Sequence, residues 1–352
     1  GYIAGFKLKL LTIYQNISQL NEIYGIEGAK TLMSAHPCWI IYAVSEEDDG
    51  KKISEKLGIY RTTISRLIKE AREKGIVEIN VRDFDTKIYA LETHFQMKYH
   101  LKFIQVVPTD LIDSDQEKDE GISRAGAAFI KQRLEKNSII GVSWGRTLAQ
   151  TIGCIENRRN THSVFVPIVG GPSHVNTRYH VNTLVYELAR KFGGSSQFVN
   201  ATVVQESKAL KEGISQSKYF SELHDYWSRL DLAIVGIGGK LTVKDSQWRD
   251  LITSDDYEDL EQREAIGDCC CRFVDRDGKV LKGSLYERTI GMDLTDLSRV
   301  PTSVGIARSK PKAKAILAML KRGYINALIT DEETALEILK ISDDLYLQEY
   351  LA

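Results

Sequence analysis

Two sets of polar side chains in this sequence have types and spacing suited to binding anions. The first set lies between Lys51 and Arg82, where nine basic residues stand against four acidic ones, although the whole chain has a formal net charge of −1. Because neutralised phosphates release condensed counterions, such a local excess favours a polyanionic partner. The candidates for direct contact are Lys51, Lys52, Tyr60, Arg61, Thr62, Thr63, Ser65, Arg66 and Lys69.

The elements around these residues have the pattern of a helix-turn-helix. Ile53 and Leu57 share one face of a first predicted helix, Gly58 supplies a turn, and a second helix follows with apolar residues at helical spacing. The start of that second helix would enter the major groove of double-stranded DNA, where Arg61 and Arg66 can contact guanine or phosphate. An ordinary helical hairpin with a solvated charged face remains the alternative.

The second set of polar residues follows predicted strands later in the chain. In open α/β sheets, ligands bind beyond the carboxyl ends of the strands, where loops lead into helix N-termini. Backbone N–H groups, the Thr147 hydroxyl and the Arg146 charge would suit a phosphate there. The candidate residues are Ser143, Trp144, Gly145, Arg146, Thr147, Gly170, Gly171, Arg178, Gly236, Gly238, Asp268 and Lys312. Each loop alone is compatible with an ordinary turn, and Trp144 with a core position, but together they predict a carbohydrate or sugar-phosphate pocket.

The elements that must position these loops alternate between strand and helix from Leu101 onward. This alternation predicts an α/β fold with a doubly wound parallel sheet covered on both faces. The predicted strands are 103–107, 139–143, 164–169, 198–201, 232–237, 270–274, 303–307 and 327–330, and the predicted helices are 86–99, 122–134, 179–192, 217–230 and 312–321. The turn signal at 275–278 predicts a small antiparallel feature.

Length and composition fit a two-domain protein with a hydrophobic core, because the chain has 352 residues of which 43% are hydrophobic. We expect an N-terminal helical extension of unknown role at 1–33, a winged helix-turn-helix domain at 34–85, a linker helix at 86–100 and an effector-binding and oligomerisation domain at 101–352. No apolar run approaches the roughly 20 residues that span a bilayer. No signal peptide is recognised either. Because an odd number of cysteines without CxxC spacing argues against a disulfide framework, we expect a reducing compartment, the cytoplasm.

The cysteines and histidines lack the spacing of a metal site. The five cysteines include no CxxC pair, and those at 269–271 are predicted to be small buried hydrophobes in a strand. His174 and His180 have no partner cluster nearby in the sequence. We therefore expect no metal and no cofactor.

Several motifs in a specific order resemble those of the SorC family of sugar-responsive bacterial transcriptional regulators. These are GIYRTTISRLIKEAREKGIV, IIGVSWGRTL, VPIVGGPS followed by RYHVNTL, LAIVGIG, GDCCCRF and KAKAILAMLKRGYINALITDEETA. The resemblance implies a winged helix-turn-helix joined to a domain similar to glucosamine-6-phosphate deaminase and ribose-5-phosphate isomerase, used as a sensor without turnover. It also implies a homotetramer that binds a palindromic operator.

The resemblance further implies roles for single residues. The anion end of the effector would meet residues 145–147, Asp268 would bind sugar hydroxyls, and Lys312 matches a late lysine of the family. The implied effector is L-sorbose or sorbose 1-phosphate, in control of a carbohydrate-utilisation operon. This chain has Arg308-Ser309 where many members have Gly-Gly, which predicts a tighter or more cationic pocket.

Two other functions remain open. A sugar-phosphate isomerase or deaminase with an attached DNA-binding module would need a general base aligned with a sugar C–H, for which Asp231, Asp268 and His174 are the candidates. None of them lies in a motif that fixes this geometry, and a sheet architecture alone does not make an enzyme. A sugar-binding protein without a DNA role would leave Arg61 to Arg66 as solvated surface. We expect a regulator without catalytic residues.

Overall fold

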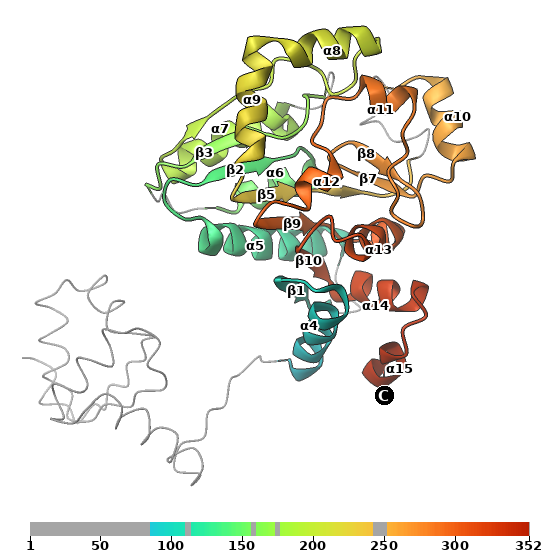
Figure 1. Cartoon of the computed structure of the whole chain (residues 1–352). Coiled ribbons are helices and arrows are strands. Elements are labelled where there is room, and N and C mark those ends of the chain that lie inside the picture. The colour runs from blue at the N-terminus through green and yellow to red at the C-terminus, as the bar shows by residue number, and fades with distance from the viewer. Residues whose placement is uncertain (1–84, 110–113, 156–159, 173–176, 242–251, 352) are drawn as a thin grey trace, which may run out of the picture. The chain divides into compact units, whose positions relative to one another are not determined.

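The computed structural model describes residues 85–109, 114–155, 160–172, 177–241 and 252–351. The predicted helix-turn-helix, its DNA-binding candidates from Lys51 to Lys69 and the N-terminal extension lie outside the described residues. The chain from Asp85 to Ala352 forms a compact unit, and the fold below is that of this unit alone (Figure 1).

A parallel sheet forms the centre of the unit, as the alternating pattern predicts. Its seven strands follow the order β1-β10-β9-β5-β2-β3-β4, and every neighbouring pair is parallel. The strands are β1 (Phe103–Val107), β2 (Ile139–Val142), β3 (Val164–Pro167), β4 (Ser195–Ser196), β5 (Leu232–Val235), β9 (Thr302–Ile306) and β10 (Ala327–Asp331).

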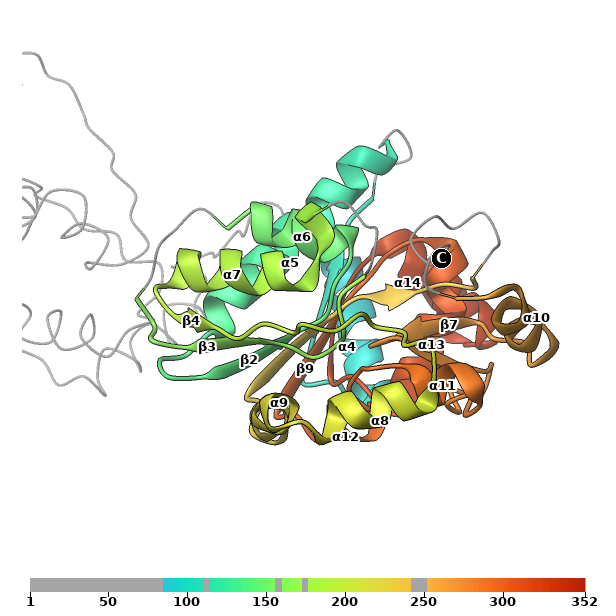
Figure 2. The same ribbon diagram turned by 90° about the horizontal axis from the view of Figure 1, so that it is seen from above.

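Helices cover both faces of this sheet (Figure 2). One face carries α5 (Asp115–Arg133), α6 (Arg146–Gly153) and α7 (Val181–Phe192), and the other carries α9 (Lys218–Ser228) and α12 (Leu294–Leu297). The remaining helices are α4 (Thr86–Tyr99), α8 (Lys208–Gln216), α10 (Ser254–Gln262), α11 (Ser284–Arg288), α13 (Ala313–Lys321), α14 (Glu332–Ile341) and α15 (Tyr346–Leu351), with 3-10 turns η1 (Thr177–Tyr179) and η2 (Lys310–Lys312).

Strand β5 shows why the sheet is buried on both faces. Leu232 and Ile234 pack into the core beneath α5, α6 and α7, while the alternate residues Ala233 and Val235 pack into the opposite core. Successive side chains of a strand point to opposite faces, so a strand covered on both sides needs an uninterrupted apolar run. The sequence LAIV meets this requirement, and all four residues are buried.

A small antiparallel sheet lies beside the large one, and here the predicted strand 270–274 was right for its last three residues and wrong for its first two. Its strands are β6 (Ile237–Gly238), β7 (Gly267–Cys269) and β8 (Arg272–Val274). Cys270 and Cys271, predicted within a strand, form the turn between β7 and β8 with φ of 50° and 60°. Two consecutive left-handed residues match the twist of a tight hairpin. The cysteines are buried, as predicted.

Other boundaries differ for local reasons. Helix 86–99 was predicted with the bounds that α4 has, and α5 begins earlier than predicted because Ser114 and Glu117 form a capping box ahead of its polar first turns. The predicted strand 198–201 was wrong. Two of its backbone N–H groups bond to side chains instead, with Val199 donating to Asn182 Oδ1 at 2.9 Å and Asn200 to the Tyr219 hydroxyl at 3.2 Å.

Candidate ligand-binding site

A cavity of about 150 Å³ opens where β2, β5 and β9 end, at the carboxyl edge of the parallel sheet. Its wall is formed by Ser143, Trp144, Gly145, Arg146, Thr147, Leu148, Gly236, Ile237, Gly238, Asp268, Cys270, Cys271, Ile306 and Lys312. Nine of the twelve ligand-binding candidates predicted from the sequence lie together in this wall. Their place at the strand ends is the one that open α/β sheets use for ligands.

The N-terminus of α6 forms one side of the cavity. Gly145 precedes the helix with φ of 143° and provides no side-chain cap, so the first N–H groups of the helix are not satisfied by a capping side chain. A Cβ at Gly145 would meet no atom within 4 Å, so the backbone conformation rather than space calls for glycine. A helix N-terminus with Arg146 exposed beside it suits an anion.

The loops after β2 and β5 are joined at the floor of the cavity. The Gly236 N–H donates to Ser143 Oγ over 3.2 Å, and the Ser143 N–H donates to the Ile234 carbonyl over 3.0 Å. Ser143 is buried, and the hydrogen bond from the Gly236 N–H fixes the position of its hydroxyl group. The two strand ends therefore present a fixed surface rather than two independent loops.

Asp268 and Lys312 face the cavity from separate elements, one on β7 and the other just before α13. Burial raises the pKa of Asp268 to about 6, against the opposing effect of Lys312. Burial also lowers the pKa of Lys312, with Asp268 opposing that change and Arg146 adding to it. Arg146 and Lys312 thus provide two cations, and Asp268 provides an acceptor for hydroxyl groups.

Three predicted residues do not line the cavity. The Gly170 N–H donates to the Ile290 carbonyl and the Gly171 N–H to the Ala201 carbonyl, both over 2.9 Å. A Cβ would lie 2.6 Å from Val203 Cα at position 170 and 2.5 Å from His180 Nε2 at position 171, so glycine serves close packing there. Arg178 is exposed in η1. The role of all twelve residues in ligand contact stays a prediction.

Sequence reasoning missed Cys270 and Cys271 as cavity residues, although they lie only two and three residues after Asp268. Burial raises the pKa of the Cys271 thiol well above its usual value, so the thiol stays protonated near neutral pH. Cys271 therefore contributes a small, weakly polar surface rather than a nucleophile. A hairpin turn at residues 270 and 271 was the missing element, because a continuous strand would send alternate side chains to opposite faces.

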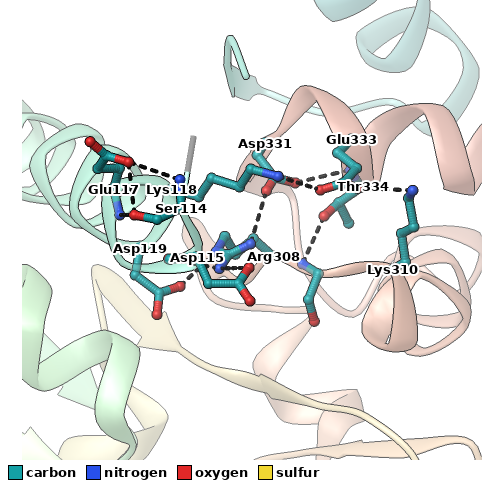
Figure 3. Close-up of polar contacts among 11 residues, drawn as sticks. Ser114, Asp115, Glu117, Lys118, Asp119, Arg308, Lys310, Asp331, Glu333 and Thr334 are labelled. Carbon is teal, nitrogen blue, oxygen red and sulfur yellow. Dashed lines mark hydrogen bonds and ion pairs between the residues drawn. The ribbon is translucent and has the colours of Figure 1, made fainter. Parts of the chain in front are cut away.

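Arg308-Ser309, which replaces the Gly-Gly of many family members, does not make the cavity more cationic as predicted. Arg308 does not line the cavity, because its side chain forms ion pairs with Asp115, Asp119 and Asp331 (Figure 3). The cavity therefore gains no cation from this position. Ser309 has φ of 102°, a conformation that favours glycine.

Two findings on metals and membranes apply to the described residues only. No group of three or more His, Cys, Asp or Glu side chains among them is arranged to hold a metal ion. Every helix in the same ranges is too short or too polar to cross a bilayer.

Comparison with known proteins defines the class to which this fold and cavity belong. The family model described as "Putative sugar-binding domain" matches residues 86–340. The sorbitol operon regulator of Klebsiella pneumoniae is 36% identical over 292 residues, which are 82% of this chain and 92% of that protein. The chain therefore has the sugar-binding domain of transcriptional regulators, and it belongs to the SorC family.

Solved structures agree with this assignment. The crystal structure of the full-length sorbitol operon regulator from Klebsiella pneumoniae covers 92% of this chain and 97% of its own, with 32% identity and a TM-score of 0.69. A transcriptional regulator from Streptococcus pneumoniae covers 74% of this chain and all of its own, with 40% identity and a TM-score of 0.72.

A second family model, described as "Type IV secretory system Conjugative DNA transfer", matches residues 1–75. This match covers 75 of the 352 residues and lies wholly outside the described part of the chain. It therefore does not define the family of the chain.

Proposed function

We propose that this chain is an operator-binding transcriptional regulator of a carbohydrate-utilisation operon, and that a sugar or sugar phosphate in the cavity sets its affinity for DNA. The observation that carries the proposal is the convergence of a helix N-terminus, two cations and a carboxylate in one cavity. These groups come from segments separated by up to 167 positions, from Gly145 to Lys312, and together they complement a ligand with an anionic end and hydroxyl groups.

The chemistry of the wall favours an effector with one anionic end. A phosphate would accept hydrogen bonds from the N-terminus of α6 and from Thr147, while Arg146 and Lys312 balance its charge. Asp268 would accept hydrogen bonds from sugar hydroxyls. We propose L-sorbose or sorbose 1-phosphate as the effector. Hexitols and their phosphates are the next candidates, since one relative is named as a sorbitol operon regulator.

Control of DNA binding requires that the effector prefer one of two arrangements of the subunits. We propose a homotetramer whose recognition helices, with Arg61 and Arg66, meet half-sites separated by whole helical turns. A ligand must bind one arrangement about 10⁴-fold more tightly to move the population from 1:99 to 99:1. A close fit to a charged effector can provide such a difference only if the cavity changes shape between the two arrangements.

A sugar-phosphate isomerase or deaminase is the second candidate, because Asp268 and Lys312 form a pair whose pKa values are shifted toward each other. Such a pair favours proton transfer. Of the two general-base candidates that the structure describes, Asp268 lines the cavity and Asp231 does not. Asp231 accepts from the Ile139 N–H over 2.8 Å at the opposite ends of β2 and β5, and His174 lies outside the described residues. Turnover of ketose or hexosamine phosphates by purified protein would favour this candidate.

Fluorescence anisotropy with promoter DNA tests the regulator proposal. The full chain is titrated at fixed salt concentration with and without free and phosphorylated ketoses and hexitols. We expect one compound to change operator affinity by at least about tenfold. Operator binding that no compound on the panel changes would contradict the proposed effector class, and the absence of DNA binding would contradict the proposal as a whole.

A further inference from the structure

The segment that joins β9 to α13, residues 306–312, contacts the cavity at its two ends and neighbouring helices in between. Ile306 at its start and Lys312 at its end line the cavity. Arg308 between them lies instead against the first turns of α5 and the start of α14 (Figure 3). Contacts made by Arg308 therefore act on the same short segment that carries Lys312.

The Arg308 guanidinium is held by carboxylates from two elements. Its Nε lies 2.6 Å from Asp119 Oδ1, its Nη1 lies 3.5 Å from Asp331 Oδ2, and its Nη2 lies 2.9 Å from Asp115 Oδ1. The Arg308 side chain is 8% exposed and that of Asp331 1%, whereas Asp115 is 91% exposed. Because an exposed ion pair adds little, Asp119 and Asp331 are the partners that matter.

Ser309 transmits this anchoring to Lys312. Its N–H donates to Thr334 Oγ1 over 2.7 Å, and its carbonyl accepts from the Lys312 N–H over 2.9 Å. Its φ of 102° is sparsely populated for a residue with a side chain. Such a conformation persists where several surrounding contacts fix the backbone. Here the ion pairs of Arg308 and the hydrogen bond to Thr334 provide these contacts.

The charges around Lys312 are balanced by the same arginine. Lys312 interacts electrostatically with Asp268, Arg146, Asp119 and Arg308. Asp119 attracts the ammonium away from the cavity and Asp268 attracts it toward the cavity. As long as Arg308 is paired with Asp119, the attraction of the Asp119 carboxylate for Lys312 is offset. Without Arg308, two carboxylates next to the segment would lack a cation.

We infer that Arg308 is a positioning residue: by pairing with Asp119 and Asp331 it keeps the Lys312 ammonium at the cavity, and so sets the affinity for an anionic effector. The part that concerns the effector rests on the proposed function. The effect of Arg308 on the position of Lys312 does not rest on the proposed function, because it is a property of the chain without ligand.

Competitive acetylation of the ligand-free full chain, read by mass spectrometry across pH, tests the position of Lys312. Without Arg308, the carboxylates hold the proton on Lys312, so Arg308→Gln should move its labelling midpoint up by about one pH unit. Adding Asp119→Asn to that variant should reverse most of the change, which a general loss of structure would not do. The control is Arg299→Gln, which removes an arginine that is 79% exposed. Equal midpoints in wild type, Arg308→Gln and the double variant would overturn the inference.

A second experiment tests the effect of Arg308 on effector affinity, with inorganic phosphate and L-sorbose 1-phosphate as probes in calorimetric titrations of the full chain. Arg308→Gln should weaken binding of both by about tenfold, and Arg308→Lys should recover part of the loss because it keeps the charge. Unchanged affinity in Arg308→Gln, with wild type binding the probes, would overturn the inference. If wild type binds neither probe, the proposed effector class fails, and the labelling midpoints still decide the role of Arg308.

A second pair of variants covers the case in which Arg308→Gln does not fold. Arg308→Lys should raise the labelling midpoint less than Arg308→Gln would, and Asp119→Asn should lower it, because a carboxylate that attracts the ammonium is removed. Midpoints in both variants equal to wild type would overturn the inference. Opposite shifts in the two variants would support it.

Discussion

Gly238 and Asp268 lie opposite each other in the antiparallel pair β6–β7, and the Asp268 carboxylate occupies the space that a side chain at position 238 would need. A Cβ built on Gly238 would lie 2.1 Å from Asp268 Oδ1. The glycine at the end of the LAIVGIG motif is therefore required by the carboxylate that faces the cavity. The absence of a side chain at position 238 thus allows the Asp268 carboxylate its observed position.

This relationship predicts that Gly238→Ala displaces the Asp268 carboxylate. We expect the response of operator binding to the effector to weaken by about tenfold, with a destabilisation of roughly 1–3 kcal/mol from the enforced shift. Effector titrations and thermal unfolding measure the two effects. Gly213→Ala is the matched control, since a Cβ there meets no atom within 4 Å. Equal responses in both variants would show that Asp268 does not contact the effector.

The pH dependence of stability should reveal Asp268. Its pKa is raised from 3.8 to about 6, so the folded chain keeps a proton that the unfolded chain releases. The stabilisation from this proton is complete below about pH 4 and is lost as pH rises to about 6. Relative to Asp268→Asn, wild type should lose about 2–3 kcal/mol over that range. Urea unfolding of both proteins at several pH values measures the difference, and parallel profiles would contradict the predicted burial of the charge.

The DNA-binding prediction concerns residues outside the described part of the chain. We expect Arg61→Ala to lose discrimination between operator and unrelated DNA by about 1–3 kcal/mol. Lys69→Ala should weaken both and lower the salt slope by about one. Exposed Lys279, far along the chain in the described unit, supplies the control Lys279→Ala. Anisotropy titrations at several salt concentrations distinguish these outcomes. If Arg61→Ala keeps the wild-type preference for operator over unrelated DNA, Arg61 is a solvated surface residue without a role in recognition.

The fold was largely predictable because most strands of the large sheet are short, largely apolar runs. Strand β10 and helix α4 follow directly from such local patterns. The two-residue strand β4 could not be predicted, because neither Ser195 nor Ser196 has a strand-favouring side chain and its pairing with β3 is a tertiary event. The turn at Cys270 and Cys271 was missed for a similar reason, since cysteine carries no turn signal in its sequence.

The site was predictable to the extent that strand ends could be recognised. Residues after β2 and β5 were assigned correctly to one edge, and they meet in the cavity because those strands are neighbours. Gly170, Gly171 and Arg178 follow β3, which the order β9-β5-β2-β3 places one strand further away. Strand order depends on how the crossovers pack, and no local pattern in the sequence encodes it.

Arginines 146 and 178 give the most direct test of the central claim, that an effector in this cavity sets operator affinity. Arg146 lines the cavity, whereas Arg178, predicted with equal reason from the sequence, does not. Operator affinity is measured by anisotropy with and without L-sorbose 1-phosphate, or whichever compound of the panel is active, in Arg146→Ala and Arg178→Ala. We predict that Arg146→Ala binds operator but loses at least about tenfold in response to the effector, while Arg178→Ala responds like wild type. A full response in Arg146→Ala together with its loss in Arg178→Ala would contradict the account and place the effector elsewhere.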